Sequence, residues 1–254
     1  MHLLREEVVS DEQMLSEREG NPRRAARLIL NAAAEGDLKA QALLGQILLD
    51  GRGIAQDAAL ALQWFLIAAH RGHAMASNMA GRCLELGWGC QPDLAAAARY
   101  YRQAARHGLE WGLYNLANLL ATGRGVPMNQ ALAFRLYHRA AELGHAKSMN
   151  LVGRYLEDGR VVPADPQAGQ QWYRRSAEAG DFRGQFSYAA VLIAQGDWAQ
   201  ARHWLVQALQ GGHLRFLRKA RDELLAAALP ELDDIALAYS RRCNELIGQA
   251  TSPV

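Results

Sequence analysis

The chain has 254 residues, of which 28 are basic and 26 acidic, so its formal net charge is only +2. Because the two signs are interspersed along the chain, the sequence lacks the electrostatic footprint of a nucleic-acid-binding protein. Half of the residues are hydrophobic but only 7% are aromatic, a balance that favours closely packed helices over sheet.

The charged residues Arg5 and Glu6 interrupt the N-terminal stretch before it contains an apolar run as long as that of a signal peptide. No later segment reaches the roughly 18 uncharged apolar residues that a membrane span needs. Three cysteines, Cys83, Cys90 and Cys243, are too few for a disulfide framework and lack zinc-ligand spacing. We therefore expect a cytoplasmic protein with no membrane partner and with reduced thiols. A disulfide between Cys83 and Cys90 is the alternative for that pair.

A fixed period runs through most of the chain. Similar strings end at glycines that are 36 residues apart, namely Gly36, Gly72, Gly108, Gly144 and Gly180. A short, constant period indicates an array of stacked repeats, because each unit alone cannot bury its apolar faces.

The predicted elements begin after residues 1–20, which fit the pattern poorly and are assigned as an N-terminal cap. Asn21 and Pro22 carry the signals of a helix start. The first full repeat then opens with an amphipathic helix, called here helix A, over residues 37–50. Helix A ends at Gly51 and Gly53, which can take the positive backbone dihedrals of a helix C-terminus.

The second helix of the repeat, helix B, starts at Asp57, whose side chain can accept the free amide protons of a first turn. It carries the large pair Trp64 and Phe65 on the same stripe as small alanines, so large residues fit against small ones. The later repeats keep this plan, with cap residues at Asp93, Asn129 and Asp165.

The array changes near its C-terminal end. After Gly180 the loop shortens, and Trp204 lies 32 residues after Trp172 (204 − 172) instead of 36. Residues 214–229 and 230–248, separated by Pro230, are predicted as two closing helices, with a frayed tail from Gly248. The domains are therefore residues 1–20 as an N-terminal cap, 21–213 as the repeat array, and 214–254 as C-terminal capping helices and tail.

These motifs resemble the Sel-like repeat, a relative of the tetratricopeptide repeat with a longer inter-helix loop. The resemblance rests on "LG" in helix A, "GxG(V/I)xxD" in the loop, and "WF" or "YY" followed by "AAxxG" in helix B. Two repeats depart from it, with Ala117 in place of the "LG" glycine and Val161 in place of the second loop glycine. The resemblance implies an all-α, right-handed α-solenoid of stacked helix-turn-helix repeats that acts as a non-catalytic scaffold or adaptor for a partner protein or peptide.

The sequence contains no linear motif for phosphate binding, zinc catalysis or an activated nucleophile. His73, His145 and His213 recur because the repeat does, and their spacing of about one unit is too large for one shared metal ion. We therefore predict neither metal nor cofactor and no enzymatic activity. The alternative is a hydrolase-type enzyme or small-ligand sensor whose site is assembled from several repeats.

The resemblance also implies where a partner binds, because in tetratricopeptide-like stacks helix A lines the concave groove. The groove positions lie six before, three before and one after the "LG" glycine. They give the predicted partner-binding residues Asn78, Arg82, Trp111, Tyr114, Asn118, Asn150, Arg154 and Arg183. Asparagine amides can pair with a peptide backbone and guanidinium groups with carboxylates. The alternative is that these side chains make hydrogen bonds between repeats.

A basic stripe lies beyond the array. Arg215, Arg218 and Lys219 have the three- and four-residue spacing of one helix face. This stripe is either a solvated surface or a docking patch for an acidic partner.

Overall fold

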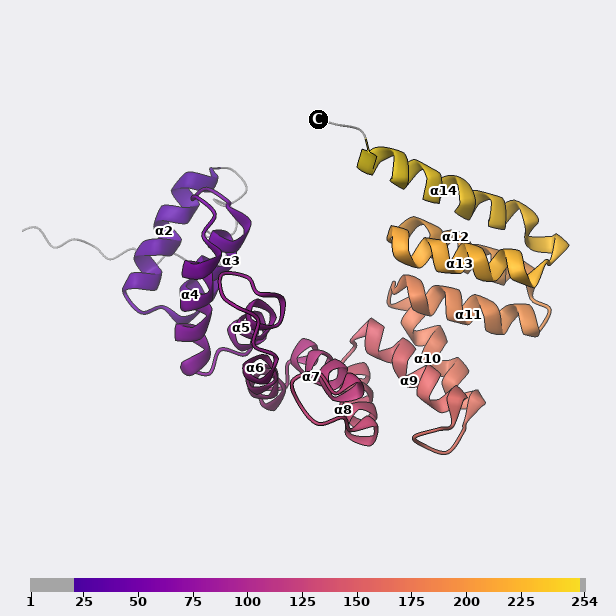
Figure 1. Cartoon of the computed structure of the whole chain (residues 1–254), viewed down its shortest axis with the longest axis horizontal. Coiled ribbons are helices and arrows are strands. Elements are labelled where there is room, and N and C mark those ends of the chain that lie inside the picture. The colour runs from indigo at the N-terminus through magenta and orange to yellow at the C-terminus, as the bar shows by residue number, and fades with distance from the viewer. Residues whose placement is uncertain (1–20, 252–254) are drawn as a thin grey trace, which may run out of the picture. The chain divides into compact units, whose positions relative to one another are not determined.

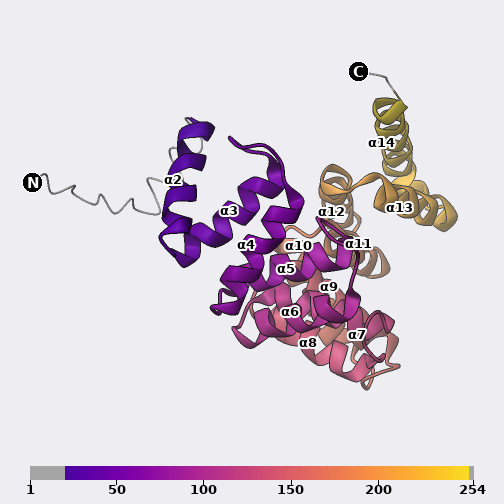
Figure 2. The same ribbon diagram turned by 60° about the vertical axis from the view of Figure 1, so that its left-hand side comes forward.

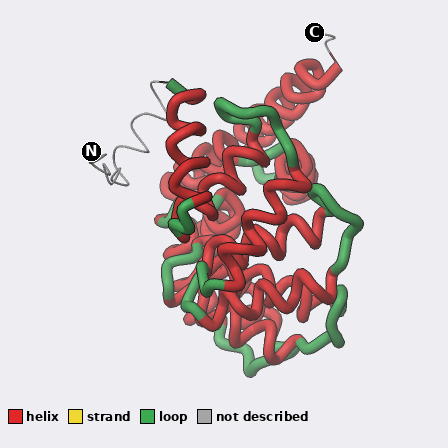
Figure 3. The backbone as a smooth tube through the Cα atoms, turned by 90° about the vertical axis from the view of Figure 1, so that its left-hand side faces the viewer, coloured by secondary structure: helices red, strands yellow, loops and turns green. Residues whose placement is uncertain are grey.

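The computed structural model describes residues 21–251, which fold into α-helices joined by short turns and loops with no strand in that range (Figure 3). The predicted all-α repeat architecture is confirmed. The predicted cap over residues 1–20 lies outside the described part of the chain. None of the described helices is both long and apolar enough to cross a membrane.

The chain divides into two compact units, and the division along the sequence falls between Asn129 and Gln130. In the first unit each helix packs on the next one along the chain (Figure 2). Its helices are α2 (Pro22–Ala34), α3 (Leu38–Asp50), α4 (Ala58–His70), α5 (Ala74–Leu86), α6 (Leu94–Arg106) and α7 (Glu110–Thr122).

The second unit continues the same alternation and closes with a longer helix (Figure 1). Its elements are α8 (Gln130–Glu142), α9 (Ala146–Asp158), α10 (Pro166–Glu178), α11 (Phe182–Ala194), α12 (Trp198–Gly211), α13 (Leu214–Ala227), the 3-10 helix η1 (Pro230–Leu232) and α14 (Asp233–Thr251). The odd-numbered helices from α3 to α11 are the A helices, and the even-numbered ones from α2 to α12 are the B helices.

The helix starts follow the capping signals in the sequence. The Asp57 side chain accepts a hydrogen bond from the Leu60 amide at 2.9 Å, and Asp93 accepts from Ala96 at 2.8 Å. Asn21 does the same at the start of α2. These side chains satisfy amide protons that the first helical turn leaves without partners.

In three repeats, a glycine of helix A lies against an aromatic ring of helix B, namely Gly45 on Phe65, Gly81 on Tyr101 and Gly153 on Tyr173. A Cβ atom on Gly45 would lie 2.7 Å from the Phe65 ring, and one on Gly81 would lie 2.6 Å from the Tyr101 ring. Phe65 is 1% exposed, whereas Trp64 is only partly buried. The second aromatic residue of each pair therefore fills the core, and the first covers its edge.

Between repeats, the second loop glycine lies against the first turn of the preceding helix B. The backbone of Gly89 has φ 74°, and a Cβ atom there would lie 2.3 Å from the carbonyl carbon of Ala58. Gly53 and Gly125 make the equivalent close approaches to Pro22 and Leu94. Val161, which replaces the fourth such glycine, is not among the described residues with positive φ, so its loop follows a different backbone path.

The C-terminal end matches the predicted pair of closing helices, with α13 and α14 separated by η1 at Pro230. Helix α14 continues through Gly248 to Thr251, three residues past the point where the sequence predicted fraying. It packs on α12 and α13, and the Tyr239 hydroxyl donates to the Leu205 carbonyl at 2.8 Å. Tyr239 is fully buried, so this contact anchors the last helix to the array.

Candidate functional site

The predicted residues of the first unit lie on the A helices α5 and α7. Asn78 is 3% exposed, and its Oδ1 accepts a hydrogen bond from Nδ2 of Asn115 at 2.9 Å. This bond joins α5 to α7. The Asn78 oxygen therefore makes a hydrogen bond between repeats, which is the alternative to partner binding that the sequence analysis gave for these residues.

The other predicted residues of this unit are aromatic, basic and amide side chains on α5 and α7. The rings of Trp111 and Tyr114 meet edge to face with centroids 6.3 Å apart, and Trp111 is 38% exposed. The Arg82 guanidinium lies over the Trp88 ring, 5.0 Å from its centroid. Asn118 is partly buried on α7, four residues beyond Tyr114.

In the second unit, the A helices α9 and α11 and the helix α13 line a pocket of about 500 Å³. It brings together three predicted residues, Asn150, Arg154 and Arg183, with two members of the basic stripe, Arg215 and Lys219. The remaining lining residues are Phe186, Ser187, His213, Phe216, Ala220 and Glu223. Three residues predicted for the groove and two residues of the basic stripe thus line one pocket.

Asn150 differs from Asn78, although the two occupy the same position of their repeats, 72 residues apart (150 − 78). Asn150 is 4% exposed, and its Oδ1 is buried with no hydrogen-bond partner among the described residues. Ser187 lies 37 residues after Asn150 (187 − 150), where Asn115 follows Asn78, and no bond from Ser187 reaches the amide. A buried acceptor without a donor is energetically unfavourable by about 1–3 kcal/mol.

The pocket is strongly basic. Its four cationic residues, Arg154, Arg183, Arg215 and Lys219, face a single lining carboxylate, that of Glu223. Glu223 lies 3.3 Å from the Lys219 ammonium. Across residues 21–251, none of the three arginines has a carboxylate partner.

Aromatic rings hold one of these arginines in place. The Arg183 guanidinium lies over the Phe182 ring, 4.4 Å from its centroid. The Phe216 ring packs on the Phe182 ring with centroids 4.6 Å apart, and it meets the Phe186 ring edge to face with centroids 5.9 Å apart. These contacts reduce the conformational freedom that Arg183 would lose on binding an anion.

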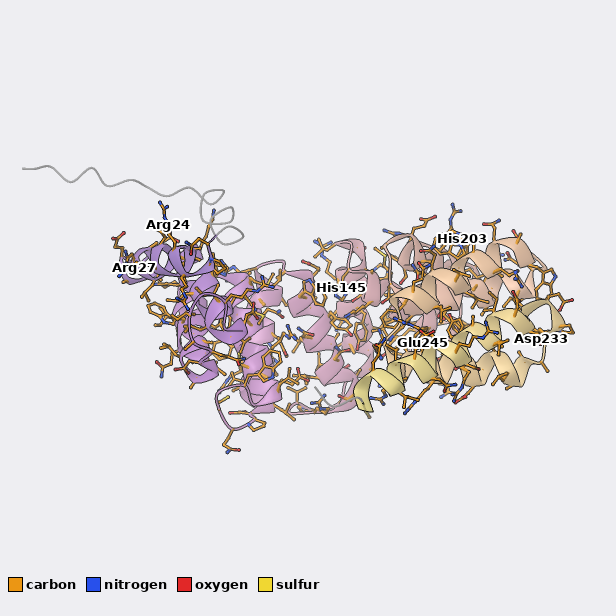
Figure 4. The ribbon with its side chains drawn as sticks, turned by 90° about the horizontal axis from the view of Figure 1, so that it is seen from above. Arg24, Arg27, His145, His203, Asp233 and Glu245 are labelled. Atoms are coloured by element: carbon orange, nitrogen blue, oxygen red, sulfur yellow. The ribbon has the colours of Figure 1, made fainter. Side chains whose placement is uncertain are left out.

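The histidines at the starts of the A helices have a structural role. His145, which precedes α9 (Figure 4), is 5% exposed, and its Nδ1 accepts from the Ser148 amide at 3.3 Å. Burial, and secondarily the nearby Lys147, lowers the pKa of His145 to about 4. His73 and His213 cap α5 and α13 in the same way. In His145, the neutral imidazole acts as a helix cap.

In the described part of the chain, no group of three or more His, Cys, Asp or Glu side chains could hold a metal ion. The thiols of Cys83, Cys90 and Cys243 are free, and the Cys90 thiol donates to the Cys83 carbonyl at 3.7 Å. Burial raises the pKa of Cys83 to about 11, which keeps this thiol protonated and unreactive near neutral pH.

Comparison with known families and structures identifies the repeats. The family model described as "Sel1 repeat" matches residues 38–73, 74–109, 112–145 and 146–181, more than half of the chain. The chain belongs to the Sel1 repeat family. Sel1 repeat proteins generally serve as scaffolds for protein interactions and are typically non-catalytic. No curated protein matches this Sel1 repeat chain.

Solved structures of similar proteins include other Sel1 repeat proteins. A Sel1 repeat protein from Oxalobacter formigenes is 23% identical with a TM-score of 0.79, covering 91% of this chain and 95% of that one. The protective antigen c5321 of uropathogenic Escherichia coli is 28% identical with a TM-score of 0.74, covering 92% of this chain and 52% of that one. An immunity protein from Pseudomonas aeruginosa is 15% identical with a TM-score of 0.52, covering 84% and 80%. The first and third similarities concern the fold alone, and this chain spans about half of the antigen.

One further pocket residue could have been placed from the sequence. The second residue of each A helix was predicted to face a groove, and this position contains Lys147 in α9 and Arg183 in α11. Counting from the cap His213 instead of the 36-residue period places Arg215 at the same position of α13. Because the loop after α11 is shorter, α13 lies outside the 36-residue spacing, and the spacing alone does not place Arg215 at this position.

Proposed function

We propose that this Sel1 repeat protein is a non-catalytic adaptor that holds a segment of a partner protein in the pocket of its second unit. The observation that carries the proposal is the convergence of α9, α11 and α13 on one pocket. This pocket combines arginines that have no carboxylate partner among the described residues, an amide oxygen without a hydrogen-bond donor, and aromatic edges. Such a mixture can supply charge, hydrogen bonding and apolar contact to one peptide.

Site-specific photo-crosslinking in the native host tests this function. A photoreactive phenylalanine analogue placed at Ser187, which lines the pocket, should form an adduct with a partner protein. The same analogue at Ala131, an exposed residue of α8 outside the pocket, is the matched control. Charge reversal of Arg183 and Arg215 should abolish the Ser187 adduct. Adducts that form only from Ala131, or a Ser187 adduct that survives charge reversal, would place the partner elsewhere.

A further inference from the structure

We infer that the pocket of the second unit is selective for an acidic peptide segment. In this assignment, carboxylates of the peptide bind Arg183 and Arg215, a backbone N–H donates to Oδ1 of Asn150, and an apolar side chain contacts Phe216. The inference rests on the proposed function and specifies the chemistry of its ligand.

The first argument is the position of positive charge on two helices that line the pocket. Arg183 and Arg215 are each the second residue of their helix, in α11 and α13. The N-terminus of a helix already carries partial positive charge, so a cation in the first turn is unfavourable by about 0.3–1 kcal/mol. Neither of these two first turns contains an acidic residue. Helix stability does not explain this placement, whereas attraction of an anion does.

The carboxylates nearby do not neutralise the guanidinium groups. Asp181 caps α11, where it is 5% exposed and accepts from the Gly184 amide at 3.0 Å. Burial raises its pKa, although the amides of α11 and the charges of Arg183 and Lys147 oppose that rise. Glu223 is on the Lys219 side of the pocket. Arg183 and Arg215 therefore remain available for a carboxylate from outside, which a guanidinium can bind through two hydrogen bonds.

The second, independent argument is the acceptor at the pocket wall. Oδ1 of Asn150 has no donor within residues 21–251, and the side chain is 96% buried, since 4% of it is exposed. A ligand that satisfies this atom must itself carry an N–H or O–H group. Each residue of an extended peptide other than proline provides such a donor in its backbone.

The aromatic residues favour an acidic peptide over other classes of anion. Phe186 and Phe216 line the same pocket and are only partly buried, so they offer apolar contact beside the charges. Inorganic phosphate carries no apolar group, and the chain as a whole has a net charge of only +2, well below that of a typical nucleic-acid-binding domain. An acidic peptide with an apolar side chain supplies every interaction that the pocket can make.

A random-peptide library displayed on phage, selected on the purified full-length protein, tests this inference. The selected peptides should be enriched in Asp and Glu. As synthetic fluorescent peptides they should bind at least tenfold more weakly to the double variant R183Q/R215Q. The control is R135Q/R241Q, which removes the same charge from exposed arginines of α8 and α14 and should bind like the wild type. Affinity should also fall as salt concentration rises.

The possible failures are distinguishable. Peptides that lose binding to R183Q/R215Q but show no acidic enrichment would overturn the inference and leave the proposed function standing. Peptides that bind both double variants equally would place recognition outside the pocket and overturn both. Competition of the selected peptide by inorganic phosphate alone at equal concentration, or stronger binding of a single-stranded oligonucleotide probe, would reassign the pocket to phosphate groups.

Discussion

The asparagines Asn78 and Asn150 provide a matched pair, because they share a repeat position and nearly equal burial but differ in one hydrogen bond. We expect Asn78→Leu to lower the free energy of unfolding by about 1–2 kcal/mol, since it removes the 2.9 Å bond and leaves the Asn115 amide without its acceptor. Asn150→Leu removes an acceptor that has no donor, so it should be neutral or stabilising by up to about 1 kcal/mol. The two variants should therefore differ by roughly 2 kcal/mol.

Urea denaturation followed by far-ultraviolet circular dichroism measures this difference. Amide hydrogen exchange in α5 and α9 shows whether each effect stays in its own repeat. Asn150→Leu should at the same time lower the affinity for the selected acidic peptide several-fold, because a backbone N–H of the peptide loses its acceptor. Equal destabilisation by both substitutions would mean that Asn150 is bonded within the stack, and the hydrogen-bond argument for the pocket would fail.

Phe65→Ala should destabilise the first unit by about 3–5 kcal/mol and Trp64→Ala by roughly 1–2 kcal/mol, as measured by urea midpoints, because only the former ring is fully buried; the reverse order would misplace the core. The folded pKa of His145, about 4, lies below the ordinary 6.5, so the unfolded chain binds the additional proton as pH falls through this window. Between about pH 7 and about pH 4, the free energy of unfolding of the wild type should therefore fall by up to about 3 kcal/mol more than that of His145→Asn. Parallel pH profiles of the two proteins would contradict this. Gly89→Ala should lower the melting temperature by several degrees more than Gly108→Ala, since both have positive φ but only the Cβ at position 89 meets backbone atoms; equal melting temperatures would contradict the close approach.

The sequence predicted the helices well because the signals that start and stop them are local. Asp57 and Gly51 act on their own first and last turns, so a single sequence with a visible period suffices to place them. It did not show which member of the pair Trp64 and Phe65 is buried. Both lie on the apolar stripe, and only the ring that faces Gly45 is enclosed.

The site was less predictable because its properties depend on contacts between repeats. The identical residue types at positions 78 and 150 differ through their neighbours, Asn115 in one case and Ser187 in the other. Periodicity alone does not reveal whether such a bond forms. The pocket also requires α13, which lies after the change of spacing and outside the 36-residue register.

The contacts of the loop glycines bear on how such proteins change in length during evolution. Gly53, Gly89 and Gly125 each approach a residue 31 positions earlier, Pro22, Ala58 and Leu94 respectively (53 − 22, 89 − 58, 125 − 94). Duplication or loss of one 36-residue segment of the gene therefore restores the same junction, wherever the exchange begins. The loop with Val161 lacks this interchangeable junction, so we expect insertions and deletions of whole repeats in related genes to fall before it.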